Sequence, residues 1–253
     1  MATENALALV VRGMDWSETS RITTLFTKEF GKVRALAKGG RRLKSNFDVA
    51  FDLLTVCQVV LIRKASGGLD LLTEARMEER FPILREKLSA LYAGYYIAEL
   101  LADGCQDYDP HPILFDSALG TLRGLGKMSS DPQALVTGFE LVWLRELGYR
   151  PRLDACAGCG APLPSKDVGR VLYSPASGGV ICPNCGQSVP DCRQISQNAF
   201  AALRELGAVT ETNDPTSIAN PQGSLGEIRQ ILGQTVSFVL GKRPRLLGYV
   251  DDR

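Results

Sequence analysis

Two Cys-x-x-Cys pairs constrain this 253-residue chain more than any other feature of its sequence. The first is Cys156-Ala-Gly-Cys159-Gly, and the second is Cys182-Pro-Asn-Cys185-Gly. Two intervening residues let both sulfurs of a pair face one ion, and the glycine that follows can adopt the left-handed conformation that closes such a turn. Four thiolates complete the tetrahedral shell of a structural zinc and leave no position for an activated water. The pattern therefore predicts one structural Zn²⁺ held by Cys156, Cys159, Cys182 and Cys185.

Other uses of these cysteines are weaker interpretations. A redox dithiol needs one Cys-x-x-Cys, not two matched pairs. An iron–sulfur cluster also takes four thiolates, but its cysteines usually follow other spacings. Disulfides suit exported proteins, and nothing in the sequence suggests export. Of the three remaining cysteines, Cys192 is close enough to the second pair to be a rival ligand, whereas Cys57 lies in an apolar run and is expected in the core.

Composition describes an ordinary globular chain, with 45% hydrophobic and 23% charged residues and a net charge of only +1. The first residues lack the basic start and apolar core of a signal peptide, and no apolar run approaches membrane-spanning length. We therefore expect a cytoplasmic protein without a membrane partner. A net charge this close to zero predicts no charged ligand. Any evidence for such a ligand has to come from where the charges lie along the chain.

Residues 1–80 are predicted to form a small β domain. Five apolar runs are separated by turn signals, and they span residues 6–11, 21–27, 32–37, 52–62 and 69–75. Five short strands without a long helical pattern suit a small closed barrel such as an OB-fold. A small open sheet packed on later helices would give the same pattern.

Basic residues concentrate in the middle of this β domain. From residue 28 to residue 44 there are seven basic residues and one acidic residue, Glu29. The basic residues are Lys28, Lys32, Arg34, Lys38, Arg41, Arg42 and Lys44. The last four lie in residues 38–44, the basic segment, where two glycines permit close approach to phosphates. Phe47 and Phe51 are candidates for base stacking, although such residues are more often core, and such a charged run is often only a solvated loop.

Residues 81–253 are predicted to be mainly helical. Apolar residues recur at three- and four-residue steps, which predicts helices over residues 84–103, 112–127, 132–147, 197–206 and 225–240. Asp131 is placed to cap the third of these helices. The cysteine pairs fall inside this region, so we expect an α+β chain. It has a β domain over 1–80 and a helical domain over 81–253, with an inserted zinc module over 154–190.

Three groups of short motifs together resemble the RecO family of bacterial recombination mediators. The first group is ALVVR (8–12), SETSR (17–21), LFT (25–27) and GKVRALAKG (31–39). The second is FEL (139–141), ELGYRP (146–151) and LD (153–154), directly before the first cysteine pair. The third is SP (174–175), GGV (178–180) and the second cysteine pair. The resemblance covers nearly the whole chain.

This resemblance implies an N-terminal OB-fold followed by a helical domain with an inserted four-cysteine zinc module. It implies binding to single- and double-stranded DNA and annealing of complementary strands during DNA repair and recombination. It also implies partnership with RecR and the single-strand binding protein, and help in loading the RecA recombinase, in the bacterial cytoplasm at the nucleoid. Some members of the family lack the cysteines, but this chain has all four.

The residues agree with a protein that carries out no bond chemistry. Annealing requires that phosphate repulsion between two strands be screened, and a basic segment on a barrel can provide this without a catalytic residue. On this interpretation Lys38, Arg41, Arg42 and Lys44 contact the DNA backbone, and Arg34 is a weaker candidate. The alternatives are a zinc-containing regulator that binds a specific duplex sequence, and a thiol enzyme that uses Cys156 and Cys159.

Overall fold

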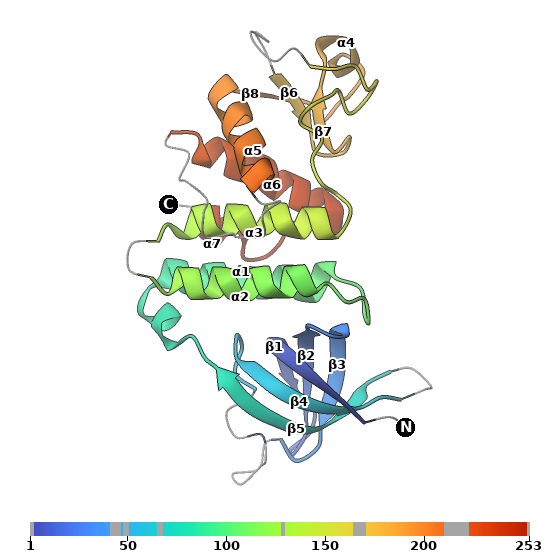
Figure 1. The fold of residues 1–253 in the computed structure, drawn as a ribbon, viewed down its shortest axis with the longest axis vertical. Coiled ribbons are helices and arrows are strands. Elements are labelled where there is room, and N and C mark those ends of the chain that lie inside the picture. The colour runs from blue at the N-terminus through green and yellow to red at the C-terminus, as the bar shows by residue number, and fades with distance from the viewer. Residues whose placement is uncertain are drawn as a thin grey trace. The chain divides into compact units, whose positions relative to one another are not determined.

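The computed structural model describes residues 3–251 apart from 41–46, 48–50, 65–67, 128–129, 164–170 and 210–222. Its contacts divide the chain into two units, Met1–Met128 and Ser129–Arg253. Figure 1 shows the strands of the first unit in blue to teal and the cysteine-containing segment of the second in yellow to tan. The predicted division into domains 1–80 and 81–253 stays a prediction.

Five strands form a closed barrel in the order β1-β2-β3-β5-β4, in which β1 also pairs with β4. The strands are β1 (Thr3–Asp15), β2 (Arg21–Thr27), β3 (Gly31–Ala37), β4 (Val56–Ile62) and β5 (Asp70–Glu79). All pairings are antiparallel except that of β3 with β5, which is parallel. This is the strand order of an OB-fold, so the prediction of a closed barrel is confirmed and the open sheet is excluded.

The barrel interior is filled by small and branched residues from alternate positions, such as Ala8, Leu25 and Ala35. Phe47 and Phe51 belong to this core, because each is only 6% exposed and their ring centroids lie 5.1 Å apart. The two phenylalanines are therefore part of the core and do not offer ring faces to a ligand.

Two helices of the first unit pack against the outside of the barrel. A short 3₁₀ helix, η1 (Pro82–Glu86), leads into α1 (Leu88–Gly104), and α2 (Pro112–Leu125) follows. Phe26 of β2 stacks on Phe115 of α2 with ring centroids 6.3 Å apart, and Lys28 forms an ion pair with Asp116 at 2.8 Å. Both contacts join α2 to the end of β2 near Thr27.

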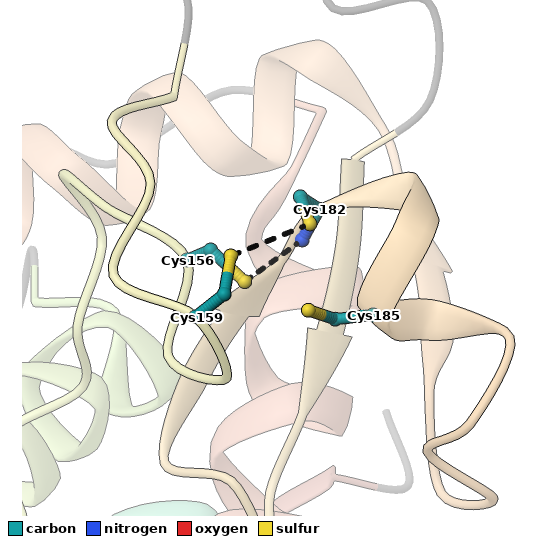
Figure 2. Close-up of side chains that lie close together, drawn as sticks. All are labelled: Cys156, Cys159, Cys182 and Cys185. Atoms are coloured by element: carbon teal, nitrogen blue, oxygen red, sulfur yellow. Dashed lines mark hydrogen bonds between the residues drawn. The ribbon is translucent and has the colours of Figure 1, made fainter.

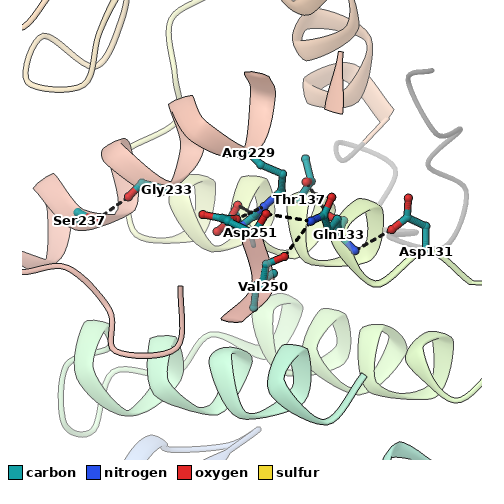
Figure 3. Close-up of polar contacts among 9 residues, drawn as sticks. Asp131, Gln133, Thr137, Arg229, Gly233, Ser237, Val250 and Asp251 are labelled. Atoms are coloured by element: carbon teal, nitrogen blue, oxygen red, sulfur yellow. Dashed lines mark hydrogen bonds and ion pairs between the residues drawn. The ribbon is translucent and has the colours of Figure 1, made fainter. Parts of the chain in front are cut away.

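The second unit is built on helices α3 (Pro132–Glu146), α5 (Gln197–Val209), α6 (Leu225–Leu240) and α7 (Leu247–Asp251). The predicted cap of α3 is confirmed, since the Gln133 backbone N–H donates to Asp131 Oδ1 at 2.9 Å. Figure 3 shows Arg229 of α6 and Asp251 of α7 meeting α3 in a polar cluster inside this unit.

A small sheet completes the second unit. Its strands run in the order β7-β6-β8, with β6 (Val171–Ser174), β7 (Gly179–Ile181) and β8 (Arg193–Ile195), and the one-turn helix α4 (Pro183–Gly186) follows β7. The buried Tyr173 on β6 lies 3.1 Å, hydroxyl to hydroxyl, from Thr235 of α6. The cysteine-containing segment therefore packs on the helices and is not a separate finger.

Candidate metal centre and nucleic-acid interface

The first cysteine pair lies in a loop held by backbone hydrogen bonds on both sides. The Cys156 N–H donates to the Ala161 carbonyl at 2.8 Å, and the Ala157 N–H donates to the Val180 carbonyl of β7 at 2.8 Å. Gly160, directly after the second cysteine, has a φ of +74°, as predicted for the residue that closes such a turn.

The second pair is built differently from the first. Cys182 ends the connection from β7, and Cys185 lies inside the helical turn α4. The prediction of a left-handed glycine is wrong for Gly186, which is helical and has no positive φ. The position is tightly packed instead, because a Cβ there would lie 2.4 Å from Leu172 Cδ1 and the leucine side chain would have to move.

The four sulfurs of Cys156, Cys159, Cys182 and Cys185 converge, and all lie within 4.8 Å of one another (Figure 2). A tetrahedron with metal–sulfur bonds of about 2.3 Å has sulfur–sulfur edges of about 3.8 Å. The distance from Cys159 Sγ to Cys182 Sγ is 3.8 Å, which equals that edge. The four-cysteine cluster therefore fits a metal ion, and Cys192, the possible rival ligand, lies outside the group of converging sulfurs.

Backbone amides favour the thiolate of Cys156. Burial of this side chain opposes ionisation, but the N–H groups of Cys182, Cys159 and Gly158 outweigh that effect and lower the pKa of the Cys156 thiol to about 6. The Cys182 N–H donates to Cys156 Sγ at 3.2 Å. Hydrogen bonds with the Cys182 and Cys159 side chains raise the pKa of Cys185 to about 12 in the absence of metal. A metal cation that binds here therefore displaces protons from the cluster.

By contrast, Cys57 lies in the barrel interior, where burial raises its pKa to about 12. Its thiol is a small core group, as its apolar sequence context predicted.

The structure describes two of the five residues predicted to bind DNA. Arg34 lies on the outer face of β3 and forms an ion pair with Asp107 at 3.2 Å, and the same carboxylate pairs with Lys32 at 3.2 Å. Lys38 follows β3 directly and is exposed. Arg41, Arg42 and Lys44 lie outside the described residues, so their part in a site stays a prediction.

Sequence reasoning missed Trp16, which lies between β1 and β2. Its side chain is 62% exposed, the largest fraction among the large hydrophobic side chains that the structure describes. A tryptophan inside a predicted turn is the sequence signal that would have indicated it, because an aromatic residue without a core position needs another reason to be there.

A second cation-rich surface lies in the second unit. A groove of about 470 Å³ is lined by Arg145, Arg150, Arg152 and Arg204, with Asp154 among its walls. Arg145 forms an ion pair with Glu146 at 3.0 Å, which offsets part of the charge.

The chain matches two family models along most of its length. "Recombination protein O N terminal" matches residues 1–81, and "Recombination protein O C terminal" matches residues 85–247. No helix within the described residues combines the length and the hydrophobicity needed to cross a bilayer.

Individual relatives agree with the family models. A protein of Rhodopirellula baltica named "DNA repair protein RecO" is 37% identical over an alignment of length 271, which covers 98% of each chain. Proteins with the same name from Anaeromyxobacter dehalogenans and Desulfitobacterium hafniense are 33% and 35% identical. The alignments cover 96% and 81% of this chain and 94% and 74% of those proteins.

Proposed function

This chain belongs to the RecO family of DNA repair proteins, and on that premise we propose that it acts as a recombination mediator. It binds single- and double-stranded DNA and anneals complementary strands. It also helps to load the RecA recombinase onto strands coated by single-strand binding protein. RecR and the single-strand binding protein are its protein partners, and the bacterial cytoplasm, at the nucleoid, is its place of action.

The observation that carries this proposal is the closed barrel of the first unit, whose strand β3 leads directly into the basic segment. OB-fold barrels bind oligonucleotides on the face of strands 2 and 3 and on adjacent loops. Cations there displace counterions from the phosphates, and this contribution to affinity does not depend on base sequence.

We assign the backbone contacts to Lys38, Arg41, Arg42 and Lys44, with Arg34 in a minor role. The ion pair of Arg34 with Asp107 supports this ranking, because a phosphate has to compete with a carboxylate for that guanidinium. None of these contacts requires a residue that makes or breaks a bond, so the protein is proposed to act by binding alone and not as an enzyme.

We propose that the four-cysteine cluster holds one structural zinc. Four sulfur donors suit this ion, and with every position filled by protein the metal has no open site for a substrate. Bound zinc would join the loop before Ala161 to helix α4, and so stabilise the small sheet between them.

The test is fluorescence-monitored annealing of two complementary oligonucleotides coated with single-strand binding protein. Wild-type protein is compared with Arg41→Ala/Arg42→Ala/Lys44→Ala after metal analysis has shown that both carry zinc. We expect the wild type to accelerate annealing and the triple variant to lose most of that acceleration.

Three further basic residues, Lys242, Arg243 and Arg245, follow α6 in the second unit. The variant Lys242→Ala/Arg243→Ala/Arg245→Ala removes the same formal charge there and serves as the control. Loss of annealing only in this control would move the DNA surface to the second unit. No acceleration by zinc-loaded wild-type protein would contradict the mediator function. In that case, sharp preference for one duplex sequence would favour the regulator.

A further inference from the structure

Trp16 directly follows β1, at the base of the hairpin loop that joins β1 to β2. The Trp16 and Ser17 N–H groups donate to the Ser20 carbonyl at 3.1 and 3.2 Å, and the Ser20 N–H donates to Ser17 Oγ at 3.1 Å. These bonds continue the β1–β2 ladder past its last strand pair, Asp15 with Arg21. The exposed indole is therefore presented by ordered backbone.

Strand register places Trp16 beside an apolar row on the outer face of the barrel. Met14 pairs with Ile22, Ile22 pairs with Leu36, and Leu36 pairs with Leu71. Their neighbours Ala35 and Ala37 point into the core, so this row points outward. Met14 is 51% exposed, and the other three side chains are partly exposed. The row gives the outer face a partly exposed apolar floor next to Trp16.

The same register places a cation in the same cross-strand row as the indole. The last β2–β3 pair is Arg21 with Ala37, so Ser20 and Lys38 come next along the two strands. Trp16 is already bonded to Ser20, which puts Trp16, Ser20 and Lys38 in one row. Lys38 also opens the basic segment. An aromatic platform and the start of a run of cations therefore lie at the same end of the barrel.

We propose that Trp16 stacks on an unpaired base of single-stranded DNA, next to the apolar row of Met14, Ile22 and Leu36. Lys38 lies toward the phosphates of the same strand. This inference rests on the proposed DNA-binding function and adds to it a residue that distinguishes single strands from duplexes.

The chemistry favours a base over other occupants. Single-strand binding sites combine cations that follow the backbone with aromatic rings on which bases stack. A duplex keeps its base faces inside the helix, so it offers an exposed indole nothing to stack on. Lys38 would bind either form, whereas Trp16 would bind only the unpaired one.

The experiment compares full-length, zinc-loaded wild-type protein with Trp16→Ala and Trp16→Phe. Three probes are used: a thymidine homopolymer, an abasic strand of the same length and a blunt duplex. Met77→Ala is the matched control, because Met77 on β5 is also an exposed apolar residue of the barrel, at 45%.

Loss of one stacked base predicts that Trp16→Ala binds the thymidine strand on the order of tenfold more weakly. Trp16→Phe should retain most of the affinity, and the abasic strand and the duplex should bind all variants alike. The chain has two tryptophans, and Trp143 is fully buried. Quenching of tryptophan emission by the thymidine strand should therefore occur in the wild type and disappear in Trp16→Phe.

Equal affinity of wild type and Trp16→Ala for the thymidine strand, with unchanged emission, would overturn the inference and leave DNA binding intact. Binding to single-strand binding protein is measured in parallel. If Trp16→Ala lost only that binding, the inference would be overturned too, because Trp16 would then make a protein contact. Failure of wild-type protein to bind any of the three DNA probes would instead contradict the proposed function itself.

Discussion

Arg229 of α6 forms an ion pair with Glu140 of α3 that is almost completely withdrawn from water. The two side chains are 2% and 0% exposed, and the guanidinium also donates to Asp251 Oδ1 at 3.0 and 2.9 Å. An isolated charge in such a place would be very unfavourable, so each partner makes the burial of the other possible. The pair therefore joins α3, α6 and α7 in one interdependent cluster.

Arg229→Met should destabilise the second unit by about 3–5 kcal/mol, because it leaves the carboxylate of Glu140 buried without its main partner. The double variant Arg229→Met/Glu140→Gln should be closer to wild type, since neither charge remains. Chemical denaturation followed by the emission of Trp143 on α3 measures both. The exposed pair of Arg80 with Asp52, at 2.7 Å, is the control, and Arg80→Ala should cost about 1 kcal/mol or less. Equal destabilisation by the single and double variants would contradict this account.

Each cysteine of the cluster should be necessary for metal binding. Cys159→Ser and Cys182→Ser should reduce the zinc content from about one ion per chain to well below one, because three thiolates no longer fill the tetrahedral shell. Cys192→Ser should retain full occupancy, since this thiol lies outside the converging group. Elemental analysis of purified protein decides between these outcomes. Loss of zinc in Cys192→Ser would mean that the ligand set is wrong.

Metal binding should release protons and strengthen as the pH rises. The pKa of Cys156 is lowered to about 6, so it is largely ionised at neutral pH, whereas that of Cys185 is raised to about 12, so it still carries a proton. Binding of zinc has to displace that proton, and lowering the pH protonates further thiolates that compete with the metal. An indicator dye should report proton release on zinc addition at pH 7, and competition with a chelator should show weaker binding at pH 6 than at pH 8. Binding that is independent of pH would contradict a thiolate site.

The salt dependence of DNA binding should identify which cations contact phosphates. Lys38→Ala should weaken binding to all sequences alike and reduce the slope of log affinity against log salt by about one unit. Arg76→Ala on β5 removes the same charge from another strand of the barrel, where the side chain is 81% exposed, and should leave the slope unchanged. If Arg152→Ala/Arg204→Ala reduced the slope and Lys38→Ala left it unchanged, the DNA would lie in the groove of the second unit.

The sequence predicted those features of the fold that local patterns encode. Alternating apolar runs predicted the strands, and the helix over residues 225–240 agrees with α6 at both ends. The cap at Asp131 and the convergence of two cysteine pairs were equally accessible, because capping and knuckle chemistry depend on a few neighbouring residues.

What could not be predicted depends on contacts between distant residues. No local pattern shows that Phe47 and Phe51 point into the barrel, or that Asp107 pairs with both Lys32 and Arg34. The sequence pattern predicted a left-handed φ for Gly186, but what distinguishes this glycine is its close packing against Leu172 of β6, which no local pattern shows. The position of Trp16 in one row with Ser20 and Lys38 likewise follows only once the strand register is known.

The stacking of Phe26 on Phe115 and the ion pair of Lys28 with Asp116 determine how much of the chain has to be kept when the barrel is transferred to another protein. Phe26 is fully buried, and Phe115 of the later helix α2 is one of the residues that cover its ring. If gene fusion or protein engineering transferred the five strands to another protein without α2, the Phe26 ring would lose its stacking partner and form an exposed hydrophobic patch prone to aggregation. The unit to transfer is therefore the barrel together with its two helices. A fragment that keeps residues 3–127 should fold and stay soluble better than one that ends with β5.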